Sequence, residues 1–397
     1  MSENRYVVLR SREIVVPSME NLGTRGVGGV EVAMPPEIEI EEVALSKSER
    51  DDLRRDPRTR AIATAMPMSL IKPVSASGAV AMPSSAVAWG VQAVGATVSP
   101  FDGGGITVAV LDTGIDPNHP AFAGVSLVRR NFTTEGDDDG HGHGTHCAGT
   151  IFGRDVDAGR IGVARGVERA LIGKVLGEGG GTSATLAQAI QWAVDEGAHV
   201  VSMSLGIDFP GFVDYLVNVE GLDVNPATSL ALEAYRANVN LFTELSRFID
   251  ARGLFEQGTI VVAASGNESE RPNYEIAVAP PAAGTGIVAV GALGEGAGGL
   301  SVAYFSNTQV DLSAPGVDVI SAAPGGGLAS MSGTSMATPH VAGVAALWAK
   351  RQLDRTGRVD GRTLMAQVVA SGARTPPLVP GSEAEDVGTG IVQAPLN

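Results

Sequence analysis

The hydrophobic and polar residues of the chain follow two different patterns. In 37–43 charged and apolar residues alternate, which predicts a strand exposed on one face. Longer apolar runs without alternation are typical of strands covered on both faces, and they occur at 105–112, 170–176, 200–205, 259–264 and 286–290. Stretches with helical spacing of apolar residues, 183–196 and 230–255, lie between these runs. Strands that alternate with helices predict an α/β fold with a doubly wound, mainly parallel sheet.

The first part of the chain predicts a separate, small α+β unit. Besides 37–43, β-rich pieces occur at 6–9, 14–16 and 60–65, and a glycine-rich patch lies at 23–29. Ser46 and Glu49 are spaced as a capping box that begins a short helix ending near residue 55. Residues 73–85 are mostly small and have the composition of an accessible linker. We therefore expect one domain with its linker over residues 1–80 and a second domain over 81–397.

Composition and charge narrow the classes of partner. With 44% apolar and 18% charged side chains, the chain has the composition of a globular protein. Its formal charge of −16 argues against nucleic acid as a partner. No apolar run reaches the roughly 18 residues of a membrane span, so no membrane partner is expected. The single cysteine, Cys147, excludes an internal disulfide. The first residues contain no hydrophobic leader, which predicts a cytoplasmic location unless a leader has been removed.

Two polar residues follow buried strands of the predicted sheet. Asp112 ends the run 105–112, and Asn267 follows the run 259–264. Functional loops of a doubly wound sheet lie at the carboxyl ends of its strands, so we expect both side chains at the same edge. Taken alone, each residue is also a common choice for a turn after a strand.

Ser335 lies at the predicted start of a buried helix. It follows a glycine-bearing turn and precedes the apolar run 341–348, and Thr334 is the candidate N-cap. Free backbone N–H groups and the positive end of the helix dipole gather at such a position. These are the groups that stabilise an oxyanion when an alkoxide attacks a carbonyl carbon. The alternative is that Ser335 only caps the helix.

Three histidines occur within six residues, at His141, His143 and His146. Imidazole is a common zinc ligand, so one interpretation is a metal site and a zinc hydrolase. The other is that one imidazole takes a proton from Ser335 while Asp112 holds its tautomer. The zinc interpretation leaves Asp112 and Ser335 without a role. The acidic residues 137–139 just before them are expected to form a solvated loop.

Three motifs resemble, in order, the signatures of the subtilisin-like serine peptidases: 111–116 (LDTGID), 143–149 (HGTHCAG) and 333–340 (GTSMATPH). The likeness runs from about Trp89 to the end of the chain. It implies that Asp112 orients the imidazole of His143, that His143 is the general base and acid, and that Ser335 is the nucleophile. Asn267, in a stretch similar to the family's oxyanion hole, would donate its side-chain amide to the oxyanion. His146 would be structural and His141 an exposed loop residue.

The resemblance also implies how substrate binds. An extended peptide would be added as a strand between two edges of the protein. One edge would be formed by Gly179, Gly180 and Gly181, and the other by Ser204, Leu205 and Gly206. The first specificity pocket would be lined by Gly206, Ala264 and Gly266, whose small size admits a sizeable apolar side chain.

The chain departs from the family pattern in three places. Ala121 stands where the family's strong calcium site has a carboxylate, and the loop 153–160 is also unlike the family's. We therefore expect no required cofactor and no strong calcium site, although a structural calcium ion is possible. The segment 207–229 is longer than the family's connection. Only 37–71 resembles the family's inhibitory prodomain.

These expectations describe a serine endopeptidase that hydrolyses peptide bonds through an acyl-enzyme and is made as a zymogen. Its partners would be a polypeptide substrate and its own prodomain. The linker would lie along the 179–181 strand and be cut between about residues 73 and 88. The rival functions are the zinc hydrolase and a permanently inhibited, inactive relative that serves as a binding module.

Overall fold

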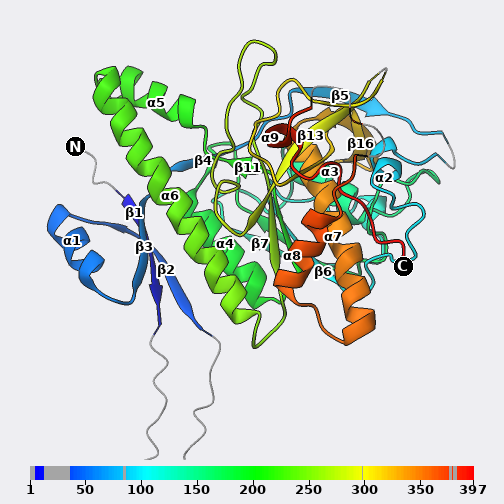
Figure 1. The fold of residues 1–397 in the computed structure, drawn as a ribbon, viewed down its shortest axis with the longest axis horizontal. Coiled ribbons are helices and arrows are strands. Elements are labelled where there is room, and N and C mark those ends of the chain that lie inside the picture. Colours follow the sequence, from blue (N-terminus) through cyan, green and yellow to red (C-terminus); the bar gives the residue numbers. More distant parts are fainter. Residues whose placement is uncertain (1–4, 13–35, 84–85, 297, 375–377, 379–381) are drawn as a thin grey trace, which may run out of the picture.

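The computed structural model describes residues 5–12, 36–83, 86–296, 298–374, 378 and 382–397. Figure 1 shows a small amino-terminal sheet beside a much larger body built on a central sheet. The expected strand at 14–16 and the glycine-rich patch at 23–29 lie outside the described residues. Within the described part of the chain, no helix combines the length and the apolar character that a membrane crossing requires.

The central sheet confirms the prediction of a mainly parallel α/β fold. Its strand order is β14-β13-β12-β10-β6-β8-β7, and β15 also pairs with β13. Every described pairing in it is parallel except that of β13 with β14. The strands are β6 (Thr107–Asp112), β7 (Ser126–Asn131), β8 (Arg169–Lys174), β10 (Val200–Met203), β12 (Ile260–Ala264), β13 (Ile287–Gly296), β14 (Gly299–Val302) and β15 (Leu312–Pro315).

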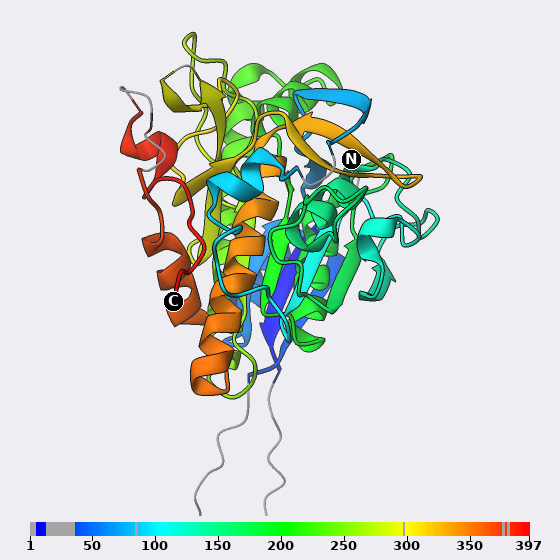
Figure 2. The same cartoon turned by 90° about the vertical axis from the view of Figure 1, so that its right-hand side faces the viewer.

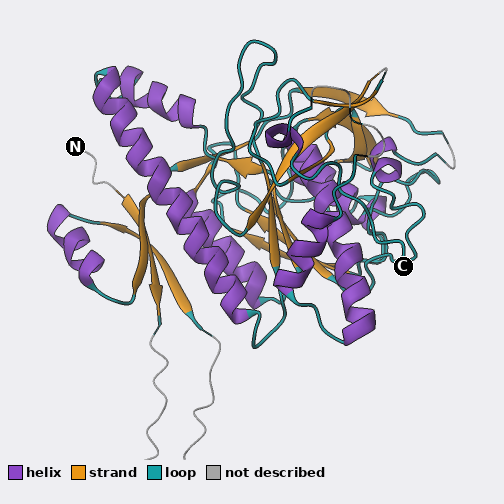
Figure 3. Ribbon diagram, viewed as in Figure 1, coloured by secondary structure: helices purple, strands orange, loops and turns teal. Residues whose placement is uncertain are grey.

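Helices cover both faces of this sheet, as Figures 1 and 3 show. One face carries α4 (Ser183–Asp195) and α6 (Val224–Arg252), and the other carries α3 (His143–Phe152), α7 (Thr334–Thr356) and α8 (Gly361–Ala370). The shorter helices are α2 (Trp89–Ala93), η1 (Pro120–Phe122) and α9 (Ala384–Val387). Along β6, Val108 and Val110 belong to one apolar core, whereas Ala109 and Leu111 belong to the other. Because both faces are buried, the strand sequences do not alternate.

The amino-terminal unit is an antiparallel sheet with one helix. Its strands β1 (Arg5–Ser11), β2 (Ile38–Ala44) and β3 (Thr59–Thr64) are arranged in the order β2-β1-β3. The helix α1 (Lys47–Arg55) begins with the predicted capping box of Ser46 and Glu49. The unit lies against α4 and α6 (Figure 1), where Gln191 donates to the carbonyl of Ile38 and Asn238 to that of Thr64.

The chain between the two domains is not the simple linker that its composition predicts. Strand β4 (Pro67–Leu70) lies between β9 (Gly181–Thr182) and β11 (Leu205–Gly206). Strand β5 (Ser75–Val80) is then added to the hairpin of β16 (Val319–Ala323) and β17 (Gly327–Ser332), as seen at the top of Figure 2. The predicted accessibility of 73–85 agrees with the exposure of residues 74–78, but residues 75–80 form a strand instead of an unstructured linker. Small side chains are compatible with either state, so composition does not distinguish them.

The inserted segment 207–229 is largely helical. It contains α5 (Phe209–Asn218), which begins at the N-cap Asp208, and it runs into the first turns of α6. The helix predicted at 230–255 consequently begins earlier, at Val224, and ends at Arg252.

Candidate active site

The four residues expected to carry the chemistry come from four separate elements. Asp112 is the last residue of β6, and Asn267 follows β12 at the same edge of the sheet. His143 is the first residue of α3. Ser335 is the second residue of α7. The expected N-cap of α7 is wrong by one position, because Gly333 is the cap and Thr334 already lies within the helix.

Asp112 and His143 form a buried hydrogen-bonded pair. The Nδ1 of His143 lies 2.8 Å from Oδ1 of Asp112, which also accepts the backbone N–H of Thr113 at 2.7 Å. Burial is the largest single influence and would lower the pKa of His143, but Asp112 and Cys147, through their charges and hydrogen bonds, together outweigh it and raise that pKa well above its ordinary value. The Nε2 of His143 is buried and has no partner among the described residues. It is thus positioned to exchange a proton with a group that enters the cleft.

Asp139 anchors the beginning of α3, although 137–139 was expected to be solvated. Its carboxylate is buried and accepts the hydroxyl of Thr113 at 2.8 Å, the N–H of Gly142 at 2.8 Å and both the N–H and the hydroxyl of Thr145 at 2.8 and 2.7 Å. Burial raises the pKa of Asp139, but these hydrogen bonds more than compensate and lower it. The hydroxyl of Thr113 in turn accepts the N–H of Gly144. The prediction for Asp139 is therefore wrong, because the donors that bury it are brought together only by the fold.

The three histidines do not converge on one point. The Nδ1 of His143 is bonded to Asp112, and the Nε2 of His146 faces the carbonyls of Val319 and Ala329 at 3.0 and 3.3 Å. Burial lowers the pKa of His146 to about 3. His141 is exposed, as expected. Within the described residues, the group whose ligand atoms lie close enough for one ion is Asp112, His143 and Cys147. This geometry does not support a zinc site of three imidazoles.

The chain's own strand β4 fills the cleft between the two expected substrate-binding edges. Met68 pairs with Gly181, Leu70 with Leu205 and Ser69 with Gly206. The expectation that 73–85 would lie along the glycine strand is wrong, because residues upstream of it do so. Gly180 has a positive φ of 79°, and a Cβ there would lie 2.6 Å from the carbonyl oxygen of Met68. A glycine is therefore needed for this close approach.

Beyond β4, two successive carbonyl groups engage the candidate catalytic side chains. The hydroxyl of Ser335 donates to the carbonyl oxygen of Ile71 at 2.8 Å. The side-chain amide of Asn267 donates to the carbonyl oxygen of Lys72 at 2.9 Å. Asn267 is held by its own oxygen, which accepts the N–H and the hydroxyl of Thr334 at 2.9 and 2.8 Å. Ser335 and Asn267 thus contact different residues of the bound strand.

Ile71 is buried and lines a cavity of about 380 Å³ together with Gly206, one of the residues expected at the specificity pocket. A Cβ built on Gly206 would lie 3.4 Å from Cδ1 of Ile71. Gly266 also lines this cavity, whereas Ala264 is buried at the end of β12 and is not part of its lining. Three further residues line the cavity without a signal in the sequence: Asp208, Glu268 and Ala279. Burial raises the pKa of the Glu268 carboxyl, which accepts the side-chain amide of Asn307 at 2.6 Å.

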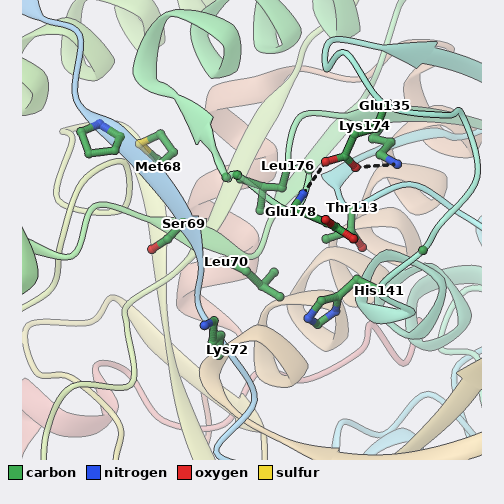
Figure 4. A pocket seen from close by; sticks show the side chains of 15 residues that line it. Met68, Ser69, Leu70, Lys72, Thr113, Glu135, His141, Lys174, Leu176 and Glu178 are labelled. Carbon is green, nitrogen blue, oxygen red and sulfur yellow. Dashed lines mark hydrogen bonds and ion pairs between the residues drawn. The ribbon is translucent and has the colours of Figure 1, made fainter.

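A second cavity, of about 600 Å³, lies on the other side of β4. Figure 4 shows Leu70 directed into it toward His141. Glu135 forms part of its wall and binds both Lys174, at 3.5 Å, and the backbone N–H of Glu178, at 2.5 Å. Gly179 and Gly180 also line this cavity.

Guanidinium groups bind the backbone around the loop 153–160. Arg154 donates to the carbonyls of Phe152, Arg165 and Val167. Arg160 donates to the carbonyls of Ala96, Gly162 and Val163. Ala121, at the position where a carboxylate was expected in the family, is buried and apolar.

The fold and the site together define a class, the serine endopeptidases built on a doubly wound sheet. The chain belongs to the subtilase family, whose model matches residues 103–375. It is 36% identical over 317 residues to M-protease of Shouchella clausii (strain KSM-K16), covering 78% of this chain and 69% of that protein. It is 38% identical over 271 residues to subtilisin BL of Lederbergia lenta, covering 66% and 84%. It is 31% identical over 318 residues to a thermostable alkaline protease of Halalkalibacterium halodurans, covering 78% and 72%.

The predicted cytoplasmic location is wrong. The relatives that the chain matches are secreted alkaline proteases, not cytoplasmic proteins. The prediction rested on the lack of a hydrophobic leader in the first residues, which carries no information if a leader lies outside the sequence.

Proposed function

We propose that this serine endopeptidase acts through Asp112, His143 and Ser335 and is made as a zymogen. The observation that carries the proposal is the strand β4, which leads a peptide into the cleft so that the carbonyl of Ile71 lies at the hydroxyl of Ser335. The buried pair of Asp112 and His143, with Nε2 of the imidazole unpartnered among the described residues, supports the role of His143 as base.

In the first step, Ser335 turns its hydroxyl from the carbonyl oxygen toward Nε2 of His143. The Oγ–C bond to the scissile carbonyl forms as the proton moves to Nε2, and Asp112 stabilises the resulting imidazolium. The C–N bond then breaks, and the leaving amine takes the proton from His143. In the second step a water molecule gives its proton to His143 and attacks the acyl carbon. The carboxylic acid leaves, and Ser335 recovers its proton.

Asn267 is proposed to stabilise the negative oxygen that develops at the scissile carbonyl. Its amide is already engaged as a donor, and its orientation is fixed by Thr334. A donor that needs no reorientation stabilises the transition state with little reorganisation. In the present arrangement the amide is one residue away from the carbonyl that Ser335 contacts, so the bound strand is not aligned for attack.

We propose that residues 1 to about 80 inhibit the enzyme until the chain is cut. The unit folds against α4 and α6, and its following strand occupies the cleft. The cut is proposed at the Ile71–Lys72 bond, because the side chain of Ile71 lies beside Gly206 and its carbonyl accepts the hydroxyl of Ser335. A one-residue shift of Asn267 from Lys72 to Ile71 would align the two catalytic groups on the same carbonyl.

Peptide hydrolysis and processing test this function together. Wild type should lose its amino-terminal segment and expose Lys72 as the new first residue, whereas Ser335→Ala should remain full length. The released segment, added back, should inhibit peptide hydrolysis by the processed enzyme. Wild type that stays full length and cleaves peptides at full rate would contradict the zymogen proposal while leaving the peptidase intact.

A further inference from the structure

Strand β5 marks a binding surface on the far side of the nucleophile from β4. It pairs antiparallel with β17, with Ser75 opposite Ser332, Ala76 opposite Met331 and Val80 opposite Leu328. Strand β17 ends three residues before Ser335, so the two are directly connected. The opposite edge of β17 is already paired with β16, which leaves β5 at the edge of this small sheet.

The contact between β5 and β17 depends on the backbone more than on side chains. Ser75, Ala76 and Ser77 are all exposed, so their side chains add little buried surface. The N–H of Val74 donates to the carbonyl of Ser332 at 2.8 Å and continues the pairing toward Ser335. An edge that holds an extended chain through its backbone accepts many sequences.

We propose that the edge of β17 is a strand-binding site for the part of a polypeptide substrate that follows the scissile bond. The proposal rests on the function proposed above. If Ile71 precedes the cut, residues 75 to 80 correspond to the fourth to the ninth residues after it (75 − 71 = 4 and 80 − 71 = 9). A long substrate is then held on both sides of the cut, between β9 and β11 before it and along β17 after it.

The chain's own strand competes for this site. After a cut at Ile71–Lys72, β5 stays tethered through residues 81–88, and tethering gives it a high effective concentration at β17. An extended substrate reaches the edge fully only when β5 is weakened or displaced. The site therefore favours long substrates, and β5 reduces that preference in the processed enzyme.

A pair of substrates and a pair of variants test the proposal. The short peptide ends three residues after the cut, and the long peptide continues with small residues through the positions of β5. Replacing Ala76 and Ser77 together by proline removes two neighbouring N–H groups, one of which faces β17 because successive N–H groups of a strand point to opposite sides. The matched control is Ala76→Gly with Ser77→Gly, which keeps both N–H groups. All measurements use the processed enzyme.

In the proline variant, kcat/KM for the long peptide should exceed that for the short peptide about tenfold, since each backbone hydrogen bond contributes a factor of roughly 2 to 10. The ratio should be smaller in the glycine control. Methylation of alternate backbone nitrogens in the long peptide should remove the advantage, and shuffling its side chains should not. An unchanged kcat/KM for the short peptide shows that the proline variant is folded.

Equal kcat/KM values for the two peptides in the proline variant would overturn the proposal. So would an advantage of the long peptide that survives methylation of either alternate set of its backbone nitrogens. Both results leave the peptidase established. Failure of the wild type to cleave the short peptide would instead reject the proposed function, and this inference with it.

Discussion

At the scale of single residues, the site depends on a few buried polar contacts. The carboxylate of Asp112 sets the charge around His143, Asp139 holds the loop that presents it, and Asn267 is fixed by Thr334. Each contact is in a region from which water is largely excluded, so its loss costs more than that of an exposed hydrogen bond. The next three predictions concern these residues.

The raised pKa of His143 predicts that the enzyme is most active at alkaline pH. His143 must be neutral to accept a proton, and a raised pKa keeps it protonated to higher pH. We therefore expect kcat/KM for a short peptide to increase with pH, with the midpoint of the increase above pH 6.5. Asp112→Asn removes the larger of the two charges that raise the pKa of His143, so it should lower the rate severely and move this midpoint to lower pH. The measurement is kcat/KM against pH for both proteins. A wild-type midpoint at or below pH 6.5 would contradict the electrostatic role of Asp112.

Replacing Asn267 by alanine should lower kcat by about 10²–10³ with little change in KM. That magnitude is known for an oxyanion-hole donor of another subtilisin-like enzyme. The selective effect on kcat is expected because the amide is most strongly engaged in the transition state. Steady-state kinetics of the processed variant provide the test. A loss of tenfold or less would mean that backbone donors alone stabilise the oxyanion.

Asp139→Asn should destabilise the protein by about 1–3 kcal/mol, because the amide group cannot accept all of the hydrogen bonds from Thr113, Gly142 and Thr145. The native pKa of Asp139 is lowered, so its contribution is present above the unfolded pKa and is lost as the pH falls through the native value. Denaturant unfolding at neutral and acidic pH measures both effects. Equal stability of variant and wild type at neutral pH would show that the network adds nothing.

At the scale of elements, the sequence predicted the strands that carry the candidate site but not where β4 and β5 bind beside it. The unalternating apolar runs identified β6 and β12, and hence the common edge for Asp112 and Asn267. The three motifs indicated His143 and Ser335 as candidate catalytic residues, and their roles stay a prediction. The burial of Asp139 and the placement of β4 and β5 depend on partners far away in the chain, such as Thr113 and β17. Composition carries no signal for such long-range pairing.

The loop 153–160 belongs to this scale as well. We propose that Arg154 and Arg160 stabilise this loop in place of a bound cation, because each donates hydrogen bonds to several backbone carbonyls. A chelator should therefore change the melting temperature little, whereas Arg160→Ala should lower it. For comparison, a ligand specific for the native state at a thousandfold excess over its Kd contributes about 4 kcal/mol. A large drop in melting temperature with EDTA that calcium restores would contradict this account.

At the scale of the whole molecule, one chain forms both the enzyme and the polypeptide that occupies its cleft. The amino-terminal sheet lies against α4 and α6, β4 enters between β9 and β11, and β5 continues along β17 (Figures 1 and 2). Together these contacts form a much larger interface than a short peptide makes. This explains how β4 and β5 can remain bound although a substrate could replace either strand. Ser335 is fully buried in the uncut chain, and the zymogen proposal predicts that it becomes accessible after processing.

Labelling by a fluorophosphonate, read by intact mass, tests this central claim most directly. The processed wild type should gain one probe, located at Ser335 by peptide mapping, because His143 is proposed to activate that hydroxyl. The processed enzyme should react much faster than freshly isolated full-length chain, whose Ser335 is covered by Ile71. Ser335→Ala and His143→Ala should remain unlabelled, and Ser335→Ala should also keep its full-length mass. Labelling of processed wild type at another residue, or no labelling at all, would contradict the account.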